Sequence, residues 1–317
     1  MSIICVLPKD VVLANELELK ANNNEVSKNS IELAQSTWYL YVSAMSSESE
    51  LGSYYLGTPF NIEASDESTI STSIFPIVDK VSSEVVYTLQ ILNDGSNSTI
   101  LETSLADELT KPTNRKFENR MNMYNILSDG SDIPEEQIPQ YNKKMVNNFL
   151  IRERQTNQPW CLYFTYASVI NTLEKKEVTN AKDLVKYNYP NATESQLMDE
   201  KYITGQQSYD TTLKNLDLKT GYKSTLLKGR LSNQVFKNEI NSNRPFIMDI
   251  RNSRVGHALT AIGYVEAKDP KFEDFYIAWN PLDYNGGYMM LSSKQLDNIN
   301  SGGELFSWAY TVYNFKK

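Results

Sequence analysis

The chain has 317 residues, of which 22% are charged and 40% are hydrophobic, which is an ordinary composition for a globular protein. This length predicts about two domains, each large enough to bury a core. No apolar run reaches the roughly 18 residues that a membrane-spanning helix needs, so we expect no membrane partner. The two cysteines, Cys5 and Cys161, are too few for a disulfide framework.

Charge is divided unevenly along the chain. Residues 1–140 contain 8 Lys and Arg against 21 Asp and Glu, whereas residues 141–317 contain 23 against 18. No basic run and no motif that reads nucleic acid stands out, so we expect no nucleic-acid partner. We expect instead that the acidic part docks on the more basic part, because complementary potentials favour association.

The first part is predicted to form one helix and a small antiparallel sheet. Residues 29–45 have an amphipathic pattern that begins at Asn29 or Ser30. Four stretches rich in β-branched residues follow, separated by turn-forming clusters. These stretches are 53–62, 69–78, 84–92 and 98–105. They predict a β-rich half-barrel packed against the helix, with no histidine and no metal-ligand cluster in it.

Residues 128–140, with the sequence SDGSDIPEEQIPQ, contain two prolines, one glycine and four acidic residues. Such a stretch is typical of an exposed linker that proteases cut, although an ordinary surface loop has the same composition. The predicted organisation is therefore a domain over 1–127, a linker over 128–140 and a second domain over 141–317.

The second domain has helices first and strands afterwards. A helix is predicted to begin near Cys161, after Pro159 and Trp160, and Thr193 and Gln196 have the spacing of a capping box. The expected helices after it are 180–190 and 193–202, and the expected strands are 244–251, 257–267, 274–281, 287–293 and 307–315. This order predicts an α+β fold in which a helical side packs on an antiparallel sheet or open barrel.

Cys161 lies in the stretch QPWCLYFTYASVI, residues 158–170, at the apparent first turn of a buried helix. Packing alone would explain it, because free cysteine is among the most buried residue types. However, the chain also has a single histidine, His257, at the start of a strand that places Ala258, Thr260 and Ile262 on one face. A thiolate nucleophile is favoured by an imidazolium and by a helix N-terminus, so this pair indicates nucleophilic catalysis.

Two further residues complete a candidate catalytic site. Asn280, in YIAWNPLD, follows the next predicted strand and can hold the ring of His257 in one tautomer. Gln155, six residues before Cys161, can donate a hydrogen bond to an oxyanion from the loop ahead of the helix. This chemistry needs no metal and no cofactor.

The stretches around these residues resemble the papain-like cysteine peptidases, most closely the staphopains, the secreted thiol peptidases of staphylococci. The resemblance rests on Gln155 and Cys161, on GHALTAIGY around His257 and on WNP around Asn280, and it runs from Tyr141 to the C-terminus. It implies a papain-like fold of two subdomains. It also implies that Cys161 is the nucleophile of an endopeptidase, His257 the general base and acid, Asn280 the orienting residue and Gln155 part of the oxyanion hole.

The resemblance further implies a secreted bacterial zymogen whose first part is a propeptide lying over the cleft. The start of the chain, MSIICVLPKDVVLA, does not have the pattern of a signal peptide, so we expect the signal to have been removed or to lie upstream. The expected partners are protein or peptide substrates, the chain's own propeptide and an activating protease. Glu135 and Glu136, or Lys143 and Lys144, are the candidate cleavage positions, and we expect a monomer.

One position departs from the family. Papain-like peptidases usually carry a Trp two residues after the orienting Asn, where it shields the His–Asn hydrogen bond, and this chain has Leu282 there. Two alternatives stay open: a catalytically inactive peptidase-like binding protein, and a Cys-His acyl-transfer or deamidating enzyme, which would more often use Asp than Asn280. Cys5 is interpreted as a packing residue or the remainder of an N-terminal hydrophobic segment.

Overall fold

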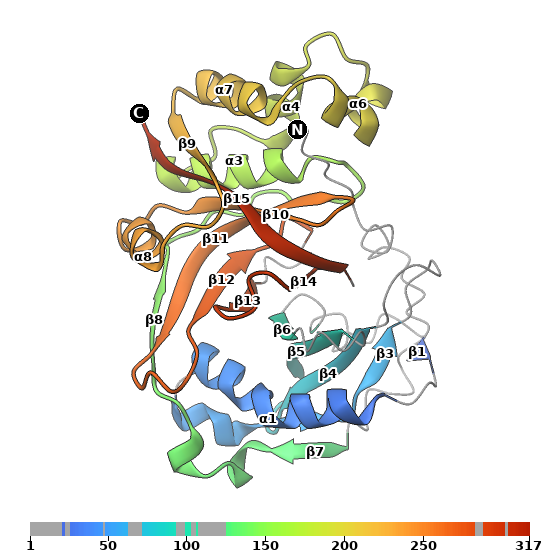
Figure 1. Cartoon of the computed structure of the whole chain (residues 1–317), viewed down its shortest axis with the longest axis vertical. Coiled ribbons are helices and arrows are strands. Elements are labelled where there is room, and N and C mark those ends of the chain that lie inside the picture. Colours follow the sequence, from blue (N-terminus) through green and yellow to red (C-terminus); the bar gives the residue numbers. More distant parts are fainter. Residues whose placement is uncertain are drawn as a thin grey trace.

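The elements of this computed structural model are arranged in layers along its long axis (Figure 1). A helical side lies at one end, an antiparallel sheet follows, and the first part of the chain lies at the other end. The structure describes residues 21–22, 26–46, 48–62, 72–92, 99–102, 106, 125–282, 288–301 and 304–317.

The first part contains the predicted helix and sheet. Helix α1 (Lys28–Met45) begins slightly earlier than expected, because the Ser27 hydroxyl accepts a hydrogen bond from the Ser30 N–H at 3.1 Å and caps it. The strands are β1 (Ala21–Asn22), β2 (Tyr54–Gly57), β3 (Phe60–Ile62), β4 (Thr72–Asp79), β5 (Val85–Leu92), β6 (Thr99–Glu102) and β7 (Ile126–Asp129). They pair antiparallel in the order β1-β3-β4-β5-β6, while β2 pairs with β4 and β7.

The segment between the two parts carries short turns. The 3-10 helices η3 (Gly130–Asp132) and η4 (Glu135–Gln137) follow β7, and residues 134–137 are exposed. Lys80 forms an ion pair with Asp129, which ties the start of this segment to the first sheet. Strand β8 (Tyr141–Met145) then pairs with the second sheet.

The helical side of the second part is built on α3, which is buried from Cys161 to Thr172. Its helices are α3 (Cys161–Glu174), α4 (Ala181–Asn188), α5 (Glu194–Leu197), α6 (Glu200–Gly205) and α7 (Tyr209–Thr220). Helix α8 (Asn233–Asn241) lies apart from them and contacts β8 and β11 (Gly256–Ala267) (Figure 1). Thr193 and Gln196 form the predicted capping box. The sequence analysis did not predict α7, although a Ser208 cap and Gly221 with a φ of 73° mark its two ends.

The second sheet contains every strand predicted for it. Its strands are β9 (Lys223–Lys228), β10 (Phe246–Arg251), β11 (Gly256–Ala267), β12 (Phe275–Trp279), β13 (Tyr288–Ser292), β14 (Ile299–Ser301) and β15 (Glu304–Lys316). They pair antiparallel in the order β13-β12-β11-β10-β15-β14, with β8 on β11 and β9 on β15. The described strands form no closed barrel, so the predicted α+β class with an open sheet is confirmed.

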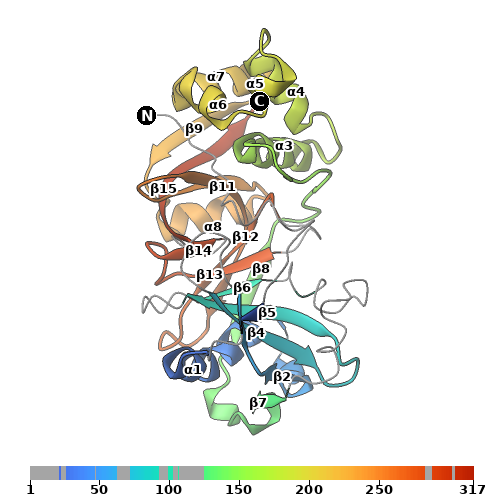
Figure 2. The ribbon, with the colours of Figure 1, turned by 90° about the vertical axis from the view of Figure 1, so that its right-hand side faces the viewer.

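The two parts share one sheet and one core. Strand β6 pairs antiparallel with β13, with Leu101 opposite Met290, so the first sheet continues into the second (Figure 2). The Tyr41 ring of α1 lies 4.8 Å from the Phe275 ring of β12, and both belong to the same cluster of buried apolar residues. No helix among the described residues is long and apolar enough to cross a membrane.

Candidate active site

Cys161 is the first residue of α3 and is completely buried. The helix rests on strand β11, where the hydroxyl groups of Ser168 and Thr260 lie 3.3 Å apart. Ala258 and Ile262 belong to the same core cluster as Cys161, so the predicted face of β11 is the one that receives the helix. Cys161 therefore lies at a helix N-terminus, where aligned peptide dipoles favour a negative charge.

The sulfur of Cys161 is engaged in a disulfide. The expected role of Cys161 as a nucleophile needs a free thiol and stays a prediction. The chain has one other cysteine, Cys5, which lies outside the described residues. A disulfide sulfur carries no thiolate, so Cys161 must be reduced before it can act as a nucleophile.

The fold brings His257 and Asn280 together. Strands β11 and β12 are antiparallel with Thr260 opposite Trp279, so the start of β11 lies beside the end of β12. The Nε2 atom of His257 lies 2.9 Å from the Oδ1 atom of Asn280. The imidazole is almost fully buried, with 2% of its residue surface exposed.

Leu282 identifies the tautomer of this ring. Its backbone N–H donates to the same Oδ1 atom of Asn280, at 3.1 Å. A backbone N–H can only donate, so the shared atom is the carbonyl oxygen, and His257 must donate to it through Nε2–H. The neutral ring therefore carries its lone pair on Nδ1, which is the nitrogen available as a base.

Burial lowers the pKa of His257 from 6.5 to about 4, and the hydrogen bond to Asn280 opposes this change only partly. The cause is that a buried imidazolium loses its hydration. His257 is therefore neutral at pH 7 in this form of the protein, in which no thiolate faces it.

Gln155 lies in the loop before α3 and is buried. Its backbone N–H donates to the Pro281 carbonyl at 2.7 Å, which joins this loop to the loop that carries Asn280. Its side-chain Nε2 donates to the Gln158 carbonyl at 2.5 Å, and its Oε1 has no hydrogen-bond partner. A primary amide nitrogen has two N–H groups, so one donor of Gln155 remains for another acceptor.

Sequence reasoning missed the backbone contacts of this site. The N–H of Leu282 and the carbonyls of Gln158 and Pro281 hold Asn280 and Gln155 in place, and no sequence pattern reports them. The Leu282 side chain itself is buried, with 4% of the residue exposed. Trp160 anchors the start of the helix, since its indole N–H donates to the Leu197 carbonyl at 2.6 Å.

Among the described residues, no group of three or more His, Cys, Asp or Glu side chains is placed to hold a metal ion.

Comparison with known proteins gives one consistent result. A family model described as staphopain peptidase C47 matches residues 136–315. Staphopain A of Staphylococcus aureus is 22% identical over 94% of this chain and 90% of its own length. Staphopain B of the same species is 21% identical over 85% of this chain and 82% of its own length. The similarity to both relatives extends into the first part of the chain.

Proposed function

Because the chain belongs to the staphopain peptidase C47 family and is a cysteine endopeptidase, we propose that it is the zymogen of a secreted enzyme with a Cys161–His257–Asn280 triad. The resemblance found in the sequence is confirmed by this family membership. The observation that carries the triad is the hydrogen bond from His257 Nε2–H to Asn280 Oδ1, which leaves Nδ1 as the base.

The proposed reaction begins with proton transfer from the reduced Cys161 thiol to His257 Nδ1. The Cys161 thiolate then attacks the scissile carbonyl carbon, and the oxyanion accepts hydrogen bonds from the Cys161 N–H and the second N–H of Gln155. The imidazolium of His257 gives its proton to the leaving amine. Water, deprotonated by the neutral ring, finally hydrolyses the thioester and restores the thiol.

The resting form fits a latent enzyme, because Cys161 is disulfide-bonded and the working nucleophile is a thiolate. Reduction gives Cys161 a thiol. Once this thiol has passed its proton to His257, the thiolate stabilises the imidazolium.

The first part acts in this proposal as the inhibitory propeptide. The described contacts that join it to the second part include the β6–β13 ladder, the Tyr41–Phe275 ring pair and a hydrogen bond from Lys143 Nζ to the Met45 carbonyl. These contacts lie at β8, β12 and β13, so the propeptide's cover over the cleft remains a prediction.

Within the described part of the chain, the ion pairs do not join the two parts. In each ion pair that the described residues form with one another, the two partners lie either both before or both after residue 140, as Lys80 and Asp129 do. Apolar packing and backbone pairing join the two parts where the residues are described, and attraction between their opposite net charges stays a prediction.

The test is cleavage of a fluorogenic peptide panel before and after a cut in the exposed turn at Glu135 and Glu136, with reductant present throughout. We expect activity only after a glutamyl-specific protease has cut the turn. The matched control is a chain with Glu135→Gln and Glu136→Gln, which this protease cannot cut there. Activity should disappear with Cys161→Ala and with an epoxysuccinyl thiol inhibitor.

Three results would contradict the proposal. Full activity of the uncut, reduced chain would refute latency through the first part. No turnover after a clean cut and reduction would favour the inactive, peptide-binding alternative. Ammonia release from a glutamine peptide without chain cleavage would indicate the deamidating alternative.

A further inference from the structure

The loop of residues 155–160, directly before α3, carries the proposed oxyanion donor at its start and leads to the nucleophile at its end. Both ends of the loop are anchored to other parts of the chain. The Gln155 N–H donates to the Pro281 carbonyl at 2.7 Å, and the Trp160 indole N–H donates to the Leu197 carbonyl at 2.6 Å. The residues between these anchors decide how the Gln155 side chain is directed.

The carbonyl of Gln158 is the group to which the Gln155 side chain is tied. It accepts hydrogen bonds from Gln155 Nε2 at 2.5 Å and from the Trp160 backbone N–H at 2.9 Å. A carbonyl oxygen only accepts, so this contact also identifies the nitrogen of the Gln155 amide. The two N–H bonds of a planar amide point in different directions. The position of the Gln158 carbonyl therefore sets the direction of the second N–H of Gln155.

The side chain of Gln158 is in turn held by Thr156. Its Oε1 atom accepts from the Thr156 backbone N–H at 2.9 Å and from the Thr156 hydroxyl at 3.0 Å. The hydroxyl also lies 3.3 Å from Asn157 Oδ1, but it has one proton and the Gln158 oxygen is nearer. The two hydrogen bonds from Thr156 close a short turn, which holds the backbone of Gln158 in place.

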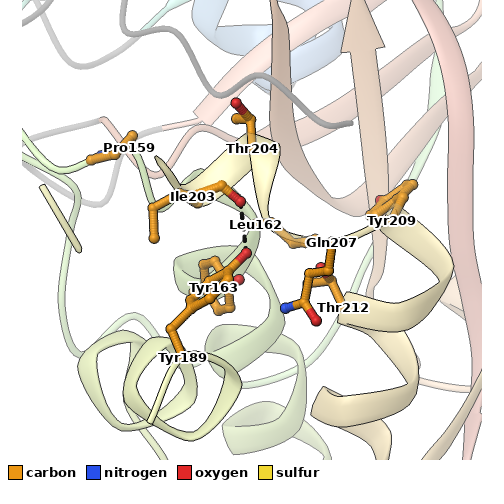
Figure 3. A pocket seen from close by; sticks show the side chains of 9 residues that line it. All are labelled: Pro159, Leu162, Tyr163, Tyr189, Ile203, Thr204, Gln207, Tyr209 and Thr212. Carbon is orange, nitrogen blue, oxygen red and sulfur yellow. Dashed lines mark hydrogen bonds between the residues drawn. The ribbon is translucent and has the colours of Figure 1, made fainter. Parts of the chain in front are cut away.

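Packing holds this turn less firmly than it holds the ends of the loop. Thr156 and Gln158 are only partly buried, and Asn157 is exposed. Pro159, which follows them, lines a narrow pocket on the helical side of the molecule (Figure 3). An atom that faces a hollow lacks packing partners on that side. Hydrogen bonds within the turn therefore decide its conformation.

The other proposed donor, the Cys161 N–H, is oriented independently of this turn. The Trp160 carbonyl accepts from the Tyr163 N–H at 2.8 Å and from the Phe164 N–H at 3.0 Å. These bonds fix the peptide plane between Trp160 and Cys161. The Cys161 N–H points opposite to that carbonyl, because the two groups are antiparallel in a trans peptide. The first turn of α3 thus sets this donor.

We propose that Thr156 and Gln158 are positioning residues of the peptidase, which direct the second N–H of Gln155 at the oxyanion through the Gln158 carbonyl. This inference rests on the proposed function and adds the residues that orient one of its donors. Orientation before the reaction matters, because a donor that is already in place costs no reorganisation when the oxyanion forms.

The experiment uses the full chain, cut in the 128–140 segment and kept reduced. Gln158→Met keeps the length of the side chain but removes the acceptor of both hydrogen bonds from Thr156. We expect kcat for a fluorogenic peptide to fall by roughly tenfold, less than the cost of removing an oxyanion donor outright, with KM changed by less than about twofold. Thr156→Val removes only the hydroxyl and should lower kcat by roughly threefold. Thr156→Ser should recover most of that loss.

Two measurements separate positioning from a general loss of structure. Alkylation of Cys161 by iodoacetamide forms no oxyanion, so its rate should stay within about twofold of the wild-type rate in every variant. A peptide aldehyde adds to the Cys161 sulfur and gives a tetrahedral adduct, so its Ki should rise as kcat falls. Asn157→Ala, at the exposed residue of the same turn, is the matched control and should keep the wild-type kcat.

A double-mutant cycle with Gln155→Ala tests whether Gln158 acts through Gln155. In the Gln155→Ala chain, Gln158→Met should lower kcat by less than a further twofold or so, because the amide that Gln158 orients is gone. An equal loss in both backgrounds would overturn the inference, and so would an alkylation rate that falls as far as kcat.

Failure of the proposed function is visible separately. If the wild type cleaves peptides and Gln158→Met cleaves them equally well, only the positioning role is refuted. If the wild type binds the aldehyde without cleaving any peptide, the proposed function fails, and the aldehyde Ki of Gln158→Met relative to the wild type decides the inference. If the wild type neither cleaves peptides nor binds the aldehyde, both are refuted.

Discussion

Acidification of the oxidised protein tests the environment of His257. The pKa of His257 is lowered from 6.5 to about 4 in the folded chain. Between these two pH values the imidazole of His257 therefore stays neutral in the folded chain, whereas it binds a proton in the unfolded chain. The free energy of unfolding therefore falls as the pH falls through this window. The difference between 6.5 and about 4, at about 1.4 kcal/mol for each pH unit, corresponds to about 3 kcal/mol.

The assay is urea unfolding without reductant at pH values from 7 to 4, followed by tryptophan fluorescence. The matched variant is His257→Gln, which can still donate to Asn280 but does not titrate. Carboxylates contribute equally to both proteins, so the difference between the two curves isolates the histidine. We expect the wild type to lose about 3 kcal/mol more than the variant by pH 4. Parallel curves would refute the buried, neutral imidazole.

Three further predictions concern the oxyanion donor and the contact between the two parts. Gln155→Ala in the cut, reduced chain should lower kcat by about 10²-fold to 10³-fold with little change in KM, as for other oxyanion donors. If peptide kinetics show that kcat falls by less than about threefold, Gln155 is not an oxyanion donor. Tyr41→Ala should weaken the hold of the cut first part by about 3 kcal/mol, over a hundredfold in Kd, because Tyr41 is fully buried against Phe275. Tyr39→Ala, on the same helix but only half-buried, should change it much less in the same titration. Raising NaCl from about 0.1 to 1 M, which screens exposed ion pairs, should change this Kd by less than about threefold, and a tenfold weakening would restore charge as the main attraction.

The sequence by itself determined the local elements around the site. Cys161 was expected at a helix N-terminus and occupies the first position of α3. The face of β11 that carries Ala258, Thr260 and Ile262 was readable because strand alternation has a period of two residues. The family motifs around Gln155, Cys161, His257 and Asn280 were readable for another reason. Each of them lies within a short contiguous stretch of the sequence.

Only the tertiary structure decided the contacts between distant backbone groups. One example is the Leu282 N–H, which identifies the His257 tautomer, and another is the Pro281 carbonyl, which holds Gln155. Both are main-chain groups, which do not depend on the side chain, so the sequence does not report their contacts. The junction of the two parts at β6 and β13 is likewise made by backbone pairing, which net charge does not report.

The side-chain amide of Gln207 shows the same division most clearly, because its nitrogen is buried without a hydrogen-bond partner. The sequence contains many Asn and Gln residues, and nothing in their spacing separates Gln207 from Gln206 beside it. Its orientation follows from Asn188 and Asn215, which α4 and α7 bring together from positions 27 residues apart. Burial of one amide nitrogen without an acceptor is a property of packing, which depends on all the neighbouring helices at once.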